Sequence, residues 1–196
     1  MKSLLVLLLL TASPGLACPT SADLKTGIVV EDDEEFKALY QIRDGQIQRT
    51  DFFDTEESWR STLAFGTFWT KEEMLRGGIH QSDDDMTVTL VDKSAAFSRP
   101  SAHLTQTVET QLSFAAESPI TETVTHSWAG VGSLSIGDCT FKSISGRIAY
   151  QSKGDTYLEI VEFLPALGIT LIVGDSISGE KPILYPARKI YVLGDE

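Results

Sequence analysis

The sequence lacks several features that would place the protein in a familiar class. It contains no asparagine, and so no acceptor site for N-linked glycans. Its longest apolar run, Leu4–Leu10, is far shorter than the ~20 residues that a membrane-spanning helix requires. Positive charge is also scarce, because 16 lysines and arginines stand against 28 aspartates and glutamates, for a formal net charge of −12. Nucleic acids and anionic membrane surfaces both require clustered cations, so the composition disfavours them as partners.

The first 17 residues have the pattern of a secretory signal peptide. Lys2 supplies the positive charge, Leu4–Leu10 forms the short apolar stretch, and Gly15-Leu16-Ala17 places small residues at the −3 and −1 positions of a cleavage site. We therefore expect residues 1–17 to be removed and residues 18–196 to form a single β domain. The short leader and the missing asparagine favour a bacterial protein of the periplasm, or one secreted from the cell.

The chain has only two cysteines, Cys18 and Cys139. An exported protein meets an oxidising compartment, so we expect these two residues to form a disulfide bond. The alternative is a lipid anchor on Cys18, the first residue of the mature chain. Lipidated bacterial N-termini usually carry leucine three residues before the cysteine, and here that position is Gly15. The disulfide is therefore the favoured interpretation, and lipidation stays open as the second.

Short runs of alternating apolar and polar residues recur every 8 to 14 positions, each closed by turn residues. This spacing is typical of an antiparallel sheet rather than of alternating strands and helices. We expect an all-β fold: a bent antiparallel sheet of roughly ten strands forming a half-barrel or open barrel, with at most one or two short helices.

Two hairpins can be placed by residue. Asp44-Gly45 suits a two-residue type I′ turn, which would put Tyr40 opposite Arg49. The second hairpin spans Leu104 to Trp128, where both strands carry apolar residues at even positions. A three-residue loop keeps the two apolar sets on one face, and it would pair Leu112 with Val124 and Val108 with Trp128.

Signals conflict between residues 55 and 85. Thr70 to Glu73 fits a capping box and Gly77-Gly78 fits a helix stop, so we expect a short helix over residues 71–76. The alternation from Leu63 to Trp69 favours a strand before it. We expect Ser82 to Asp85 to form a turn.

No motif for a known reaction is present. The glycine-rich stretch from Gly130 to Gly137 contains neither G-x-S-x-G nor a phosphate-binding loop, and a hairpin or β-bulge accounts for it. His80, His103 and His126 lie too far apart in sequence for a short metal-binding motif. The acidic runs 32–35 and 83–85 do not alternate as calcium loops do, and we expect solvated turns there. We therefore expect no metal, no cofactor and no catalytic residue.

Three residues are candidates for ligand binding: Glu122, His126 and Trp128, which share the apolar face of one predicted strand. A histidine beside an aromatic residue on such a face suits the wall of a pocket. Glu122 and Glu162 each interrupt an apolar pattern. A carboxylate on a core face is either paired or at a sheet edge, so we expect structural pairing for both before any function.

Residues 128–171 carry two short motifs, Gly137-Asp138-Cys139-Thr140-Phe141 and Glu162-Phe163-Leu164-Pro165-Ala166-Leu167-Gly168-Ile169. This pattern resembles one in uncharacterised bacterial periplasmic β-sheet proteins, which look similar to the half-barrel lipoprotein-carrier architecture. The motifs are structural, so the resemblance implies a fold more than an activity.

The pattern as a whole predicts a non-catalytic binding or accessory protein of the periplasm. A curved sheet of this size needs a cover for its inner face, and the sequence offers no long amphipathic helix to supply one. We expect an apolar concave face that takes a lipid-like ligand or a segment of an envelope protein. The alternatives are a hydrolase-like enzyme with dispersed carboxylates and a structural envelope protein.

Overall fold

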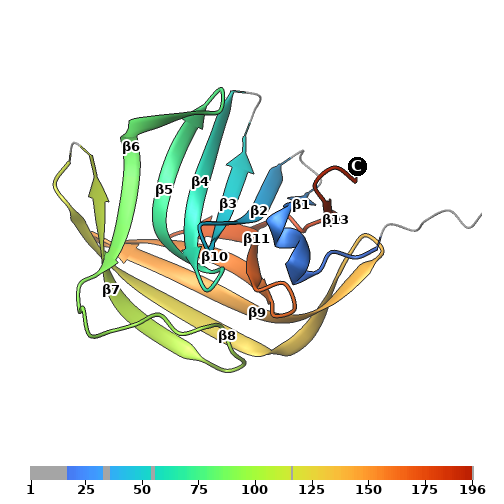
Figure 1. The fold of residues 1–196 in the computed structure, drawn as a ribbon. Helices are drawn as coiled ribbons and strands as arrows, with labels where there is room; N and C mark the ends of the chain where they lie inside the picture. The colour runs from blue at the N-terminus through green and yellow to red at the C-terminus, as the bar shows by residue number, and fades with distance from the viewer. Residues whose placement is uncertain (1–16, 33–35, 54–55, 116, 196) are drawn as a thin grey trace, which may run out of the picture.

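The computed structural model describes residues 17–32, 36–53, 56–115 and 117–195, and within them a single antiparallel sheet of thirteen strands (Figure 1). The strands lie in the order β12-β11-β10-β9-β8-β7-β6-β5-β4-β3-β2-β1-β13, so nearly every strand pairs with its neighbour in sequence. A short 3-10 helix, η1, precedes the sheet. In chain order the elements are η1 (Ser21–Lys25), β1 (Ile28–Glu31), β2 (Lys37–Arg43), β3 (Gln46–Phe52), β4 (Glu57–Ala64), β5 (Phe68–Arg76), β6 (Ile79–Leu90), β7 (Thr105–Phe114), β8 (Ile120–Ile136), β9 (Cys139–Ser152), β10 (Asp155–Leu164), β11 (Ile169–Ile177), β12 (Ile183–Leu184) and β13 (Lys189–Val192).

The sheet is not closed, but it curls until strands far apart in its order meet across the interior (Figure 1). The ring of Trp69 on β5 lies 5.9 Å from that of Tyr150 on β9. The hydroxyl of Tyr40 on β2 donates a hydrogen bond of 2.8 Å to the carbonyl of Thr170 on β11. The expected bent antiparallel sheet in the form of an open half-barrel is thus confirmed.

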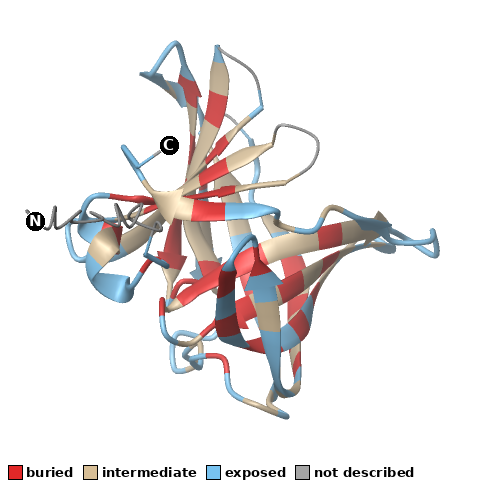
Figure 2. Ribbon diagram, turned by 90° about the vertical axis from the view of Figure 1, so that its right-hand side faces the viewer, coloured by how far each residue is buried: buried red, intermediate tan, exposed pale blue. Residues whose placement is uncertain are grey.

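Two apolar clusters hold the curled sheet together. The larger contains Ile28, Tyr40 and Leu164 and joins both halves of the sheet, while the second is built on β7 to β10 around Val124 and Phe163. Buried and exposed positions alternate along these strands, as Figure 2 shows. This alternation is the period of two that the sequence displays.

The hairpin between β2 and β3 has the predicted turn and register. Asp44 and Gly45 have φ angles of 52° and 77°, and the pairs include Tyr40 with Arg49. The two positive φ values belong to a type I′ turn, whose twist matches that of the flanking strands.

The helix expected over residues 71–76 is wrong, because this segment belongs to β5, which pairs with β4 and β6. Gly77-Gly78, with φ angles of 56° and 77°, forms a hairpin turn instead of a helix stop. The strand expected from Leu63 to Trp69 is interrupted by a turn at Phe65-Gly66, where both φ angles are positive. Strand pairing with β4 and with β6 therefore outweighs the local capping pattern.

The turn expected at Ser82–Asp85 is also wrong, since these residues lie within β6. The register between β5 and β6 shifts between Glu72 and Met74, so the strand passes through this acidic run by way of an irregularity. Of the other acidic run, residues 33–35 lie outside the described residues. A similar register shift between Trp128 and Val131 confirms a bulge in the glycine-rich stretch of β8.

The hairpin of β7 and β8 has the predicted faces but a different register. Val108, Val124 and Trp128 are all buried, as the even-position pattern required. Val108 pairs with Val124, however, and not with Trp128, and Leu112 pairs with Ile120. The connection is longer than the expected three residues, because pairing with β8 ends at Leu112 and Ile120, while Ser113 and Phe114 are paired with β6 on the other edge of β7. A shift of four residues conserves the faces, since the side-chain period is two.

Cys18 and Cys139 form the expected disulfide bond, with Cα atoms 5.5 Å apart. The bond fastens the segment before η1 to the start of β9. Apart from Ala17, the leader expected over residues 1–17 lies outside the described residues. In the described part of the chain, no helix combines the length and apolar character needed to cross a membrane.

Candidate functional site

The concave side of the half-barrel contains an apolar cavity of ≈210 Å³. Six consecutive strands, β5 to β10, contribute to its wall, because their curvature turns the same face of each strand inward. Phe97, from the segment between β6 and β7, closes one side by stacking on Phe68 with ring centroids 4.1 Å apart. The lining residues are Phe68, Trp69, Met86, Val88, Phe97, Thr110, Leu112, Glu122, Val124, His126, Tyr150 and Tyr157.

Two of the three predicted binding residues, His126 and Glu122, line this cavity. His126 is 3 % exposed, and its ring lies 4.2 Å from that of Phe68. Burial lowers the pKa of His126 to about 3, so its imidazole is neutral near pH 7. Its Nδ1 has no hydrogen-bond partner among the described residues. Thr110, which also lines the cavity, donates to Oε1 of Glu122 at 3.2 Å.

Glu122 is a buried carboxyl group in a mostly apolar wall. Burial raises its pKa, and the hydrogen bond from Thr110 opposes that rise. The two polar groups that interrupt the apolar face of β8 thus both reach the cavity.

Trp128 and Glu162 lie elsewhere. Trp128 packs over Gly146 of β9, where an added β-carbon would lie 2.5 Å from its ring, and meets Phe163 edge to face. Trp128 therefore belongs to the core and not to the described cavity wall. Glu162 accepts a hydrogen bond of 2.6 Å from the hydroxyl of Ser145 on β9, in keeping with the structural pairing expected for it.

A second cavity, of ≈430 Å³, adjoins the first and shares Trp69 and Tyr157 with it. Its wall combines aromatic rings with carboxylates from β3, β5, β10 and β11. We call it the acidic aromatic cavity. Its lining residues are Asp32, Phe36, Arg49, Asp51, Phe53, Trp59, Trp69, Glu72, Tyr157, Glu159, Ile172, Asp175 and Tyr185.

Glu159 is the most deeply buried of these carboxyl groups, with 2 % of its surface exposed. Burial raises its pKa to about 7, and the positive charge of Arg49 opposes the rise. The hydroxyl of Tyr150 donates to its Oε2 at 3.1 Å. Because Tyr150 also lines the apolar cavity, this bond connects the two cavities.

Arg49 and Asp51 form a buried ion pair on β3, with Nε and Oδ1 2.7 Å apart. Arg49 is the only cation among the described residues that line the acidic aromatic cavity. Burial raises the pKa of Asp51 and of Glu72, and the positive charge of Arg49 opposes the rise at both.

The sequence contains one signal for this second cavity, although none of the predicted binding residues lines it. Arg49 and Asp51 stand two apart on β3, and charged residues at that spacing share one face of a strand. Glu159 lies at the same spacing from Tyr157 and Val161 on β10. The spacing of residues does not show which strand faces come together across the interior, because that depends on how the whole sheet curls.

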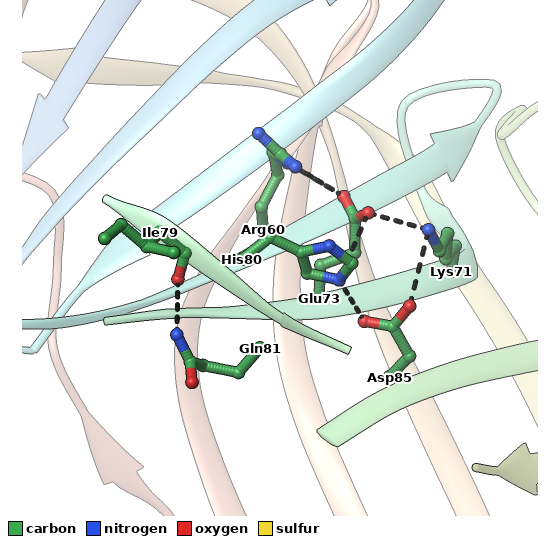
Figure 3. A network of polar contacts seen from close by, with 7 residues as sticks. All are labelled: Arg60, Lys71, Glu73, Ile79, His80, Gln81 and Asp85. Atoms are coloured by element: carbon green, nitrogen blue, oxygen red, sulfur yellow. Dashed lines mark hydrogen bonds and ion pairs between the residues drawn. The ribbon is translucent and has the colours of Figure 1, made fainter. Parts of the chain in front are cut away.

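A polar network joins β4, β5 and β6 (Figure 3). Oxygen and nitrogen ligand atoms of Glu73, His80 and Asp85 lie within 4.8 Å of one another. The ammonium of Lys71 is 2.7 Å from Glu73 and 3.7 Å from Asp85, and Arg60 also pairs with Glu73. The protein's own cations therefore neutralise this group, which makes it an ion-pair network.

Replacing Glu159 with glutamine should change how stability depends on pH. The folded-state pKa of about 7 exceeds the ordinary 4.5, so the folded protein retains a proton that the unfolded chain loses. The contribution of Glu159 to the free energy of unfolding of the wild type therefore falls progressively between about pH 4.5 and 7, where the unfolded chain loses a proton that the folded protein keeps. The free energy of unfolding of Glu159→Gln, relative to the wild type, should rise by on the order of 1 kcal/mol per pH unit across this interval.

Urea denaturation at a series of pH values measures this difference. His126 acts in the opposite direction, since its lowered pKa makes stability rise with pH over part of the same interval, so only the difference from the wild type is diagnostic. The groups facing Glu159 are Arg49, Asp51, Glu72 and Tyr150, all retained in the variant. Glu109→Gln, at an exposed position, controls for the chemical change. Parallel pH curves for Glu159→Gln and the wild type would contradict the prediction.

Comparison with protein-family models, with curated proteins and with solved structures finds no match to this chain. The resemblance of residues 128–171 to periplasmic half-barrel proteins therefore stays a prediction.

Proposed function

We propose that the protein is an exported binding protein whose half-barrel holds the apolar chain of a lipid-like ligand. The observation that carries the proposal is the apolar cavity on the concave face, which the side chains of six strands surround but do not fill. Apart from Phe97, its rings come from residues of the sheet, so most of the pocket wall is formed before a ligand arrives. Preformed apolar pockets with a few polar groups are the usual form of small-molecule sites.

The sizes of the cavities support this function. The apolar cavity alone is smaller than the ~300–1,000 Å³ typical of small-molecule sites, whereas the acidic aromatic cavity beside it falls within that range. The two cavities, one apolar and one polar, both have the rings of Trp69 and Tyr157 in their walls, and we call the pair the groove. A long, narrow molecule with unlike ends suits such a groove.

The other two interpretations have less support. A hydrolase with two carboxylates would need an acid that reaches the substrate. Glu159 has a suitable pKa, but it is almost completely buried and bonded to Tyr150. A purely structural protein would fill its half-barrel, and this one leaves two cavities in it. Export is supported by the leader pattern and by the disulfide bond between Cys18 and Cys139.

A neutral, apolar fluorescent probe tests the proposal. N-phenyl-1-naphthylamine brightens in apolar surroundings, and we expect saturable brightening with one probe per protein. Val88→Phe, which adds bulk to the cavity wall, should weaken binding at least tenfold. Val91→Phe is the matched control, because Val91 is exposed just beyond the end of β6 and does not line the cavity. Absence of saturable binding, or equal weakening in both variants, would refute the proposal.

A further inference from the structure

The acidic aromatic cavity has the composition of a site for a cation. Among the described residues, five carboxyl groups line it against one guanidinium, that of Arg49. Six aromatic side chains stand among them, and the faces of such rings attract cations. The lining carboxyl groups are Asp32, Asp51, Glu72, Glu159 and Asp175, and the rings are Phe36, Phe53, Trp59, Trp69, Tyr157 and Tyr185.

The single positive charge of Arg49 balances only part of the negative charge that the carboxyl groups of this wall can carry. Its guanidinium pairs with Asp51 on the same strand and its charge also acts on Glu159 and Glu72, but the hydrogen-bond partners of the carboxyl groups of β5, β10 and β11 are other side chains. These partners are neutral hydroxyl groups. Ser61 donates to Glu72 at 3.0 Å, Tyr150 donates to Glu159, and Tyr185 donates to Asp175 at 3.0 Å. Hydroxyl donors orient these carboxyl groups without supplying a positive charge.

The position of the cavity supplies an independent argument. Trp69 and Tyr157 line both cavities, so a ligand that extends past these two rings from the first cavity would place its end group in the second. The groove also contains the buried His126, whose Nδ1 has no partner among the described residues. The groove is therefore more than an acidic cluster, because it combines an apolar cavity, two shared aromatic rings and an acidic cavity.

We propose that the ligand of this groove is a cationic amphiphile, with an ammonium head in the acidic aromatic cavity and an alkyl chain in the apolar one. This inference rests on the proposed function, because it assigns the head group of the same ligand. An ammonium head would meet aromatic faces and carboxylates together, the combination that protein sites for alkylated ammonium groups use. A sulfate or phosphate head would meet the same carboxylates with the opposite sign of interaction.

Three probes with the same ten-carbon chain separate the head group from the chain: decyltrimethylammonium, decyl maltoside and decyl sulfate. Each is titrated below its micelle concentration, and displacement of N-phenyl-1-naphthylamine reports binding. We expect the cation to bind at least tenfold more tightly than the neutral maltoside, and the sulfate to bind more weakly than either.

Matched charge variants separate the site from the general attraction of an acidic protein for cations. Glu72→Gln removes one charge from the cavity wall, and Asp84→Asn removes one from an exposed position of β6. Glu72→Gln should weaken binding of the cation at least fivefold and leave the maltoside unchanged, whereas Asp84→Asn should change neither. Asp175→Asn provides a second wall variant if Glu72→Gln fails to fold.

The outcomes distinguish the two proposals. Equal binding of the cation and the maltoside, or equal weakening by Glu72→Gln and Asp84→Asn, overturns the cationic head while the apolar-chain function stands. Failure of all three amphiphiles, together with failure of the naphthylamine probe, overturns both.

Discussion

Replacing Gly66 with alanine is expected to lower the free energy of unfolding by about 4 kcal/mol, because a β-carbon at this position would overlap the carbonyl oxygen of Gly168. Gly66 lies in the turn between β4 and β5, and Gly168 lies in the turn between β10 and β11. Overpacking alone costs ~1–3 kcal/mol. Moving the turns apart would also stretch the buried hydrogen bond that Thr170 N–H donates to the carbonyl of Gly66, at 2.9 Å, and such a loss costs ~1–3 kcal/mol more.

This contact is where the two halves of the sheet meet. The hydroxyl groups of Thr67 and Thr170 are 2.7 Å apart, and Tyr40 donates to the carbonyl of the same Thr170. Separating the turns would therefore also widen the groove. We expect Gly66→Ala to weaken binding of N-phenyl-1-naphthylamine along with stability.

Gly78→Ala is the control for backbone strain. Gly78 has a φ angle of 77°, close to the 69° of Gly66, but no atom lies within 4 Å of the position its β-carbon would take. Alanine at either position bears the cost of positive φ, which is roughly 1 kcal/mol. Urea denaturation of both variants isolates the contact with Gly168. Equal losses in the two variants would mean that the turns do not hold the half-barrel together.

Local patterns predicted the faces of strands well and the partners of strands less well. The type I′ turn at Asp44-Gly45 fixes its own register, because a two-residue loop leaves no freedom. The β7–β8 loop is longer, so the even positions fixed only which side chains face inward. In the structure Leu112 pairs with Ile120, and Phe114 beyond it pairs with Met86 of β6 on the other edge of β7. Any even shift of the register keeps the same faces, so alternation alone does not select one shift.

The failed helix over residues 71–76 shows the same limit. A capping pattern and a glycine stop are local signals worth about 1 kcal/mol each. In the structure both edges of this segment pair with other strands, and it contributes Glu72 to one cavity wall and Glu73 to the ion-pair network. Adjacent residues of a strand point to opposite faces, so one short segment serves both.

The candidate site was predictable only in part. Glu122 and His126 share one strand face, and their interruption of an apolar pattern marked them. Glu159 and Arg49 lie 110 positions apart in the sequence and meet only because β10 and β3 face each other across the curled sheet. No pairing rule links these strands, since they are not neighbours in the sheet. Sites of this kind depend on how the sheet curls, and the periodicity of the sequence does not encode that curl.

Breaking the disulfide bond is expected to lower the free energy of unfolding by about 4 kcal/mol, since closing a long loop restricts the unfolded chain strongly. Cys18 and Cys139 are 121 residues apart in the sequence, so most of the sheet lies within the loop. In the folded protein the bond also holds the segment that leads into η1, whose Leu24 is buried in the larger apolar cluster.

Urea denaturation of the wild type with and without reductant measures the effect. The variant Cys18→Ala, which leaves the buried Cys139 in place, should match the reduced wild type and should not respond to reductant. The exported wild type should also be lighter than its reduced form by the mass of two hydrogen atoms. A diacylglycerol group on Cys18, or two thiols open to alkylation in the native protein, would contradict this prediction. Either result would also weaken the case for export into an oxidising compartment, because that case rests on the disulfide together with the leader.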